Sequence, residues 1–269
     1  MAEETSIVEL GDWFDTPPGR YVRAWEQAQF DAIVADVFGF NALQVGLPGL
    51  DLLQANRMPF KVFVGDSLAK AELASQWQAQ VVARPEALPF ESDSIDLLVL
   101  PHAFESTDEP HRVLREVERV LVPEGRVVVS GFNPWSLWGL RANLPGMPPW
   151  LPHPPSAQVS LARLKDWFKL LSFEVDRGRF GCYAPACMTD VWLRRWAFME
   201  KAGDRWWPVC GATYVVSAVK RVAGARIIGA PWKKRRRARR VAVPVPQGPG
   251  GAHRAQAEAV RHTATGIKE

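Results

Sequence analysis

The chain has 269 residues, of which 47% are hydrophobic and 23% charged, a composition typical of a globular protein with one large core. Its net charge of +4 is unevenly divided: residues 221–269 hold 12 Lys and Arg against 2 Asp and Glu, whereas residues 1–220 hold 21 against 27. No run approaches the roughly 18 apolar residues of a membrane-spanning helix, and the acidic N-terminus lacks the apolar segment of a signal peptide, so we expect a cytoplasmic protein without a membrane partner.

The first part of the chain is predicted to alternate helices and strands. Apolar residues recur at helical spacing over residues 21–38, and Gly39 is a suitable C-terminal stop. Three short apolar segments are predicted to be buried strands, and the segment before the third is predicted to be a helix: strands 41–46, 60–66 and 79–85, and helix 69–77.

Residues 88–132 form the clearest unit. Residues 95–100 are a continuous apolar run, which is typical of a parallel strand covered on both faces. A helix over 108–121 follows, with Asp108 as its predicted N-cap and Pro110 in its first turn. After a turn, 127–132 is predicted to be another buried strand. Strand, helix and strand with short turns indicate a βαβ unit and therefore a parallel sheet.

A long loop rich in Pro and Trp occupies residues 133–155, and long loops in compact domains are usually functional or mobile. A helix over 160–171 follows, capped by Ser160. Residues 173–181 and 211–221 are predicted to be closing strands, with a partly helical segment over 182–208 between them. We therefore expect one domain over 1–220 and a disordered basic tail over 221–269. The three cysteines, Cys182, Cys187 and Cys210, have no paired spacing and are expected to be free thiols.

Two stretches resemble the class I S-adenosylmethionine-dependent methyltransferases of the methyltransferase type 11 group. The first is "ALPFESDSIDLLVLPHAFESTDEPHRVLREVERVLVPEGRVVVSGF" (87–132), and the second, "SGFNPWSLWGLR" (130–141), is similar to a proteobacterial subgroup with this fold. The resemblance covers about residues 20–220. It implies an α/β, Rossmann-like fold with a mostly parallel seven-stranded sheet and helices on both faces, and S-adenosylmethionine as the cofactor.

The resemblance also implies where the cofactor binds, because ligands of such sheets lie at the carboxyl ends of the strands. The family has a glycine loop after its first strand, an acid after the second that binds the ribose, and a residue after the third that meets the adenine. The matching residues are expected to bind the cofactor: Gly46, Gly49, Asp66, Arg84 and Glu86.

The glycine loop departs from the family pattern. Gly46 matches its first glycine, but Pro48 and Leu50 occupy the next two glycine positions, and Gln44 stands where an Asp is usual. Proline has no N–H and a fixed φ, so this loop is expected to differ in geometry from the family's. Gly46 is equally consistent with an ordinary turn after a strand, and Asp66 with a helix N-cap.

Candidate catalytic and acceptor-binding residues follow the next two strands. His102 and Glu105 come after the predicted strand 95–100, where a base would remove a proton from the acceptor; the alternative is that they are polar loop residues. Asn133, Trp135 and Trp138 follow the strand 127–132 and are expected to line the acceptor pocket, unless the tryptophans pack the loop onto the domain. We expect no metal site.

Three hypotheses remain open from the sequence. The first is a methyltransferase with an unidentified acceptor, and the second is a catalytically inactive binding module with the same fold. The third is an RNA-associated protein whose basic run 233–240 binds nucleic acid through salt-dependent contacts. A nicotinamide dehydrogenase is disfavoured because no G-x-G-x-x-G follows a predicted strand. The sequence gives no indication of the oligomeric state.

Overall fold

A computed structural model describes residues 10–68, 76–144, 150–154 and 156–221 of the chain. Contacts between Cα atoms divide the chain into Met1–Gly224 and Ala225–Glu269, and every described residue belongs to the first unit. The basic run 233–240 and most of the predicted helix 69–77 therefore lie outside the described residues.

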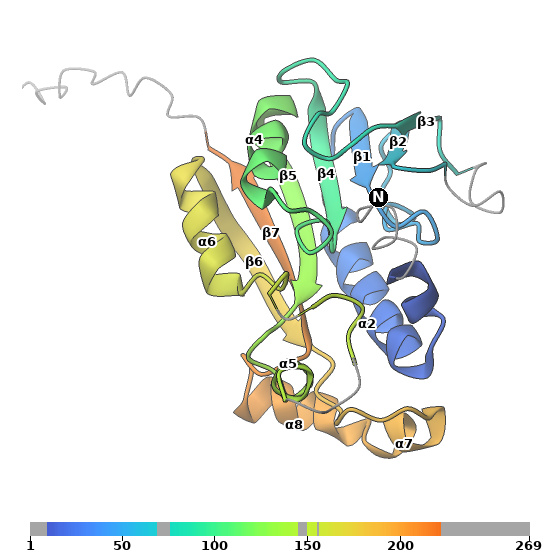
Figure 1. The fold of residues 1–269 in the computed structure, drawn as a ribbon. Coiled ribbons are helices and arrows are strands. Elements are labelled where there is room, and N and C mark those ends of the chain that lie inside the picture. Colours follow the sequence, from blue (N-terminus) through green and yellow to red (C-terminus); the bar gives the residue numbers. More distant parts are fainter. Residues whose placement is uncertain (1–9, 69–75, 145–149, 155, 222–269) are drawn as a thin grey trace, which may run out of the picture. The chain divides into compact units, whose positions relative to one another are not determined.

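Seven strands form one sheet in the order β3-β2-β1-β4-β5-β7-β6 (Figure 1). The first five strands run parallel, and β7 runs antiparallel to both of its neighbours. Their bounds are β1 Asn41–Val45, β2 Phe60–Gly65, β3 Ala79–Val82, β4 Ile95–Pro101, β5 Leu121–Phe132, β6 Phe173–Gly181 and β7 Thr213–Lys220. The order reverses between β1 and β4, which is where an open α/β sheet forms its ligand crevice.

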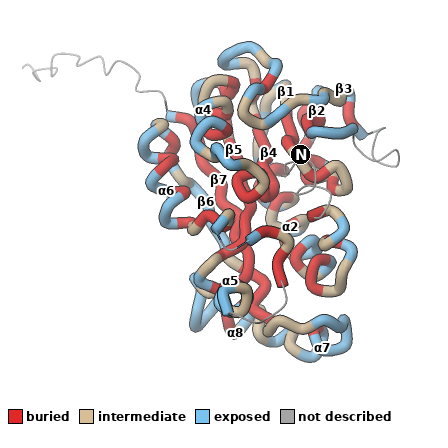
Figure 2. Tube along the Cα trace, viewed as in Figure 1, coloured by how far each residue is buried: buried red, intermediate tan, exposed pale blue. Residues whose placement is uncertain are grey.

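Two apolar layers cover the two faces of the sheet. On one face, the central strands pack against the helices α4 (Pro110–Val120) and α6 (Leu161–Leu170). On the other face they pack against α2 (Pro17–Val34). Because both faces are covered, the central strands β1, β4 and β7 are buried along most of their length, whereas the edge strands β3 and β6 are not (Figure 2). Three shorter helices lie near one end of the sheet: α5 Leu137–Ala142, α7 Asp190–Arg195 and α8 Phe198–Trp206 (Figure 1).

The structure confirms the predicted fold class, and it differs from the predicted elements in detail. Helix α4 is capped by Glu109 rather than Asp108, because Pro110 itself occupies the start of the helix. Strand β5 begins at Leu121, so that the predicted turn is an irregular part of the strand with Glu124 at a φ of 64°. The predicted loop 133–155 contains α5, whose N-cap Ser136 accepts a hydrogen bond from the Gly139 N–H. No helix within the described ranges is long and apolar enough to cross a membrane.

Candidate functional site

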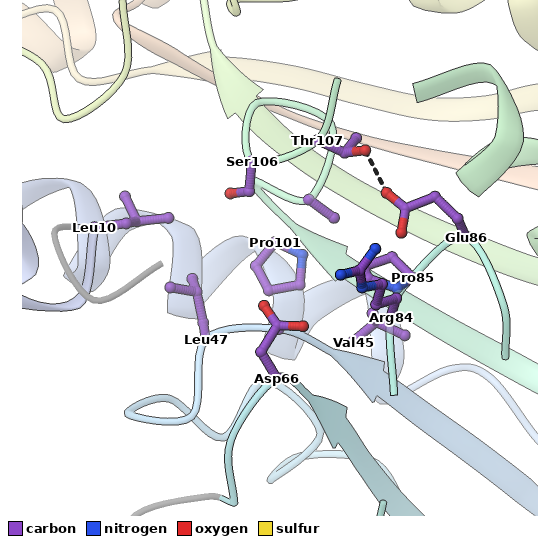
Figure 3. Close-up of a pocket in the computed structure, with 12 residues that line it drawn as sticks. Leu10, Val45, Leu47, Asp66, Arg84, Pro85, Glu86, Pro101, Ser106 and Thr107 are labelled. Atoms are coloured by element: carbon purple, nitrogen blue, oxygen red, sulfur yellow. Dashed lines mark hydrogen bonds between the residues drawn. The ribbon is translucent and has the colours of Figure 1, made fainter. Parts of the chain in front are cut away.

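Four of the five residues that we expected to bind the cofactor line one hollow at the carboxyl edge of the sheet (Figure 3). Gly46 follows β1, Asp66 follows β2, and Arg84 and Glu86 follow β3. The hollow contains about 530 Å³ of empty space, open solvent included. Parallel strands end at a common edge, and this explains why residues up to 40 positions apart in the sequence converge here.

The turn after β1 has a backbone that suits close approach of a ligand. Gly46 has a φ of 84°, and a Cβ added at this position would meet no atom within 4 Å. The next residue, Leu47, also has a positive φ of 52°, which is strained for a branched side chain. Both residues line the hollow. An open space beside a strained turn is consistent with a bound ligand in place of a side chain.

The buried side chain of Gln44 holds this turn in place. Its Nε2 donates to the Leu50 carbonyl at 2.7 Å, and its Oε1 accepts from the Leu52 N–H at 2.9 Å. Nε2 also lies 3.3 Å from the Gly46 carbonyl oxygen. One buried side chain therefore joins the backbone of Gly46, Leu50 and Leu52. The sequence showed that position 44 departs from the family, but it gave no sign of this role.

Gly49 does not line the hollow at Gly46. It lies with Pro48 at a separate depression beside Phe14 and Asp15, and its carbonyl accepts a hydrogen bond from Arg23 at 3.4 Å. The structure therefore separates Gly49 from the other four residues that we expected to bind the cofactor. The reason is the loop itself, because Leu50 is buried in the core and turns the second half of the loop away from the hollow.

The lining of the hollow also includes charged and hydroxyl groups. Figure 3 shows the Asp66 carboxylate pointing into the hollow on the same side as Arg84. The Thr107 hydroxyl donates to the Glu86 carboxylate, which joins the loop after β3 to the loop after β4. Two carboxylates and one guanidinium give the wall a net negative formal charge.

His102 and Glu105 form a buried cluster with Glu26, directly behind the loop after β4. His102 Nδ1 lies 2.8 Å from Glu105 Oε2, and its Nε2 lies 3.0 Å from Glu26 Oε1. Glu26 comes from α2, where it also lies 2.7 Å from the hydroxyl of Thr213 on β7. The Phe132 N–H on β5 donates to the other oxygen of Glu105. The cluster therefore ties together α2, β4, β5 and β7.

Burial and charge act in opposite directions on this cluster. Burial is the largest effect on His102 and disfavours its charged form, but the carboxylates of Glu26 and Glu105 outweigh it and raise the pKa of His102 to about 10. Burial raises the pKa of Glu105, and His102 partly offsets this. An imidazolium at neutral pH with no exposed surface does not fit the role of general base that we predicted. His102 and Glu105 belong to the loop after β4, and their bonds to Glu26 and Phe132 give them the role of holding this loop in position.

A second, larger hollow adjoins the first, and the two share Ser106 and Thr107. It contains about 1230 Å³ of empty space, open solvent included, and extends between the loop after β4, the loop before α6 and Trp167. Its lining includes the buried side chains of His153 and Gln158, which the sequence analysis did not identify. Burial, and then repulsion from His102, lower the pKa of His153 to about 4, so its imidazole is neutral at pH 7.

The three residues expected to line an acceptor pocket lie elsewhere. Trp138 is fully buried and its Nε1 donates to the Ala184 carbonyl at 2.7 Å, so it is a core residue and the expectation for it is wrong. Asn133 and Trp135 line a separate surface hollow beside α6. The side chain of Asn133 donates to the carbonyls of Val209 and Gly211, which fixes the chain before β7.

Comparison with known sequences identifies the group to which this chain belongs. Residues 57–129 match the model of a methyltransferase domain family, a range that starts after the Gly46 turn. The Escherichia coli K12 protein described as uncharacterized protein YafS is 35% identical over 171 residues, which are 63% of this chain and 68% of YafS.

Solved methyltransferase structures share the fold at low sequence identity. A chain of the complex between the Haloferax volcanii Trm112 methyltransferase activator and a methyltransferase has a TM-score of 0.55 at 17% identity, over 81% of this chain and 98% of that one. An Archaeoglobus fulgidus S-adenosylmethionine-dependent methyltransferase has a TM-score of 0.53 at 17% identity, over 74% of this chain and 94% of that one. A Mesorhizobium loti S-adenosylmethionine-dependent methyltransferase has a TM-score of 0.51 at 16% identity, over 71% of this chain and 96% of that one. None of these comparisons supports the inactive binding module. This chain therefore belongs to the family of YafS, contains a match to the methyltransferase domain family over residues 57–129, and has the Rossmann-like fold of the S-adenosylmethionine-dependent methyltransferases.

Proposed function

We propose that the protein transfers a methyl group from S-adenosylmethionine, bound in the hollow at Gly46, to an acceptor that enters through the adjoining larger hollow. The observation that carries this proposal is the convergence of Gly46, Asp66, Arg84 and Glu86 on one cavity. These residues match the family's cofactor positions, and they come from three successive strand ends.

The charged residues of the first hollow fit the cofactor in sign. S-adenosylmethionine carries one more positive than negative charge, and the wall formed by Asp66, Arg84 and Glu86 has the opposite balance. We assign the ribose hydroxyls to Asp66, as the family resemblance implies, and the contact with the turn to Gly46 and Leu47.

When bound, the cofactor supplies a methyl group on a positively charged sulfur, and the protein must align the acceptor with that group. Ser106 and Thr107 border both hollows, which supports a role for the loop after β4 in aligning the acceptor with the cofactor. The buried cluster of Glu26, His102 and Glu105 fixes this loop from behind. On the acceptor side, the lining of the larger hollow includes His153, whose imidazole is neutral at pH 7.

Calorimetric titration with S-adenosylmethionine and S-adenosylhomocysteine tests the proposal. The wild-type protein is expected to bind both ligands with micromolar affinity. Asp66→Asn removes a charge-assisted hydrogen bond, which is worth about 1.5–3 kcal/mol, so binding should weaken by about tenfold to a hundredfold. Asp36→Asn, an exposed carboxylate on the segment after α2, is the control and should bind as the wild type does. Absence of heat and of thermal stabilisation at millimolar ligand would overturn the proposal.

A further inference from the structure

Large apolar side chains gather on the surface of α5, α7, α8 and the segments beside them. Among the described residues, 17 large hydrophobic side chains are exposed, and 11 of these lie within 135–144 and 188–209. These segments lie together at one end of the molecule (Figure 1). We call this area the aromatic surface and define it by Trp135, Leu140, Trp192, Phe198, Trp206 and Trp207.

Helix α8 has its apolar face turned outward. Its inward side carries Gly203, where an added Cβ would lie 2.2 Å from the Tyr183 ring, and Glu200, which accepts hydrogen bonds from the Tyr21 hydroxyl and the Tyr183 N–H. Its outer side carries Phe198, which is 60% exposed, and Trp206, which is 69% exposed. A helix of a globular protein normally buries its apolar stripe, so this reversed arrangement indicates a partner that is apolar.

The charged groups around these rings are mainly cationic. Exposed Arg194, Arg195, Lys201 and Arg205 accompany the rings of α7 and α8, with Arg195 5.3 Å from the centre of the Trp192 ring and Arg205 5.9 Å from that of Trp206. The two helices carry three acids: Asp190 pairs with Arg20 at 2.7 Å, Glu200 faces inward, and Asp204 is exposed. The four exposed basic residues outnumber this one exposed, unpaired carboxylate. Tryptophan rings with arginines and lysines beside them are typical of segments at the interface between water and anionic lipid.

We propose that the aromatic surface docks on an anionic lipid bilayer, with its rings at the level of the headgroups and its arginines beside the lipid phosphates. Helices of six and nine residues are too short to cross a bilayer, so the attachment is peripheral. The sequence of the tail complements this assignment, because seven of the eight residues 233–240 are Lys or Arg. The expectation of no membrane partner depended only on membrane-spanning segments. Docking does not depend on the proposed methyl transfer.

Flotation of the full-length protein with lipid vesicles tests the proposal. Vesicles of phosphatidylcholine with phosphatidylglycerol should carry the wild-type protein upward, and vesicles of phosphatidylcholine alone should carry much less of it. The double variant Trp206→Ser, Trp207→Ser should lower the partition coefficient on the anionic vesicles by about tenfold or more, because two rings no longer enter the interface.

The double variant Phe38→Ser, Phe40→Ser is the matched control. These rings are 78% and 75% exposed, but they precede β1 at the opposite edge of the sheet. This control should float within about twofold of the wild type. Both double variants should keep the wild-type circular dichroism spectrum, because all four side chains are mostly in water.

Three results would overturn the proposal. One is a wild-type protein that does not float with anionic vesicles. Another is a Trp206→Ser, Trp207→Ser variant that floats as well as the wild type, together with loss of flotation when the basic residues of 233–240 are replaced by Gln. Lipid binding would then belong to the tail alone. The third is a wild-type dimer that the tryptophan substitutions convert to a monomer in sedimentation equilibrium, with no vesicle binding, which would assign the surface to a second copy of the chain.

Discussion

The Gln44 side chain provides the sharpest test of how the glycine-poor turn is built. Gln44→Leu keeps the approximate shape of the side chain but removes its amide. The Leu52 N–H and the Leu50 carbonyl would then lose their partner in the core. A buried polar group left without a partner costs about 1–3 kcal/mol, and two such groups cost about 2–6 kcal/mol. The apolar side chain of leucine adds about 1–2 kcal/mol of stability by burial. The free energy of unfolding should therefore fall by about 3 kcal/mol.

The free energy of unfolding, measured by urea denaturation of wild type and variant, checks this value. Gln78→Leu is the control, because Gln78 is an exposed glutamine whose amide oxygen also accepts from a backbone N–H, that of Lys61 at 2.7 Å. The free energy of unfolding of Gln78→Leu should fall by no more than about 0.5 kcal/mol, because water replaces the lost hydrogen bond. A Gln44→Leu variant as stable as the Gln78→Leu variant would refute the role that we assign to Gln44.

Three further predictions concern the same region. Gly46→Ala should lower the free energy of unfolding by about 1–2 kcal/mol through its positive φ alone, since the new methyl meets no atom; urea denaturation showing no loss would mean that the turn differs from the structure. His102 has a folded pKa of about 10 against 6.5, so its contribution to stability is complete below pH 6.5 and is lost as the pH rises toward 10. The urea midpoint of the wild type should therefore fall relative to His102→Gln over this range, and parallel profiles would contradict the assignment. The NMR signals of the His153 ring should not shift between pH 8 and about 5, because its pKa is about 4; titration near 6.5 would show that the ring is not buried.

The fold could be predicted from the sequence because local patterns and tertiary packing agree over most of the chain. The apolar run at 95–100 is nearly the observed strand β4, and the amphipathic stripe after it is the buried side of α4. The family resemblance assigned Gly46, Asp66 and Glu86 to the ends of three strands. Because the strands are parallel, their ends lie at one edge of the sheet, and so these residues could be predicted to lie together. The family's positions did not predict where Gly49 lies. The path of a loop depends on which of its side chains is buried in the core, and here that side chain is Leu50.

The buried cluster could be predicted only in part. His102 and Glu105 are three residues apart, but Glu26 is 76 residues from His102, and no local pattern joins the two. A signal was present nevertheless: Glu26 occupies the same helical stripe as Val22 and Phe30, at a spacing of four residues. An acid on an apolar stripe is expected to have a buried cationic partner. The neutral state of His153 could not be inferred, because it arises from burial by a loop without regular structure.

The measurement that tests the central claim most directly is a crystal structure of the protein grown with saturating S-adenosylhomocysteine. Density for the ligand in the hollow bounded by Gly46, Asp66 and Glu86, with the Asp66 carboxylate on the ribose hydroxyls, is the result that we expect. Density for the ligand at another place on the molecule, or a hollow closed by Leu10 and Leu47 with no ligand in it, would contradict the assignment of this hollow to the cofactor.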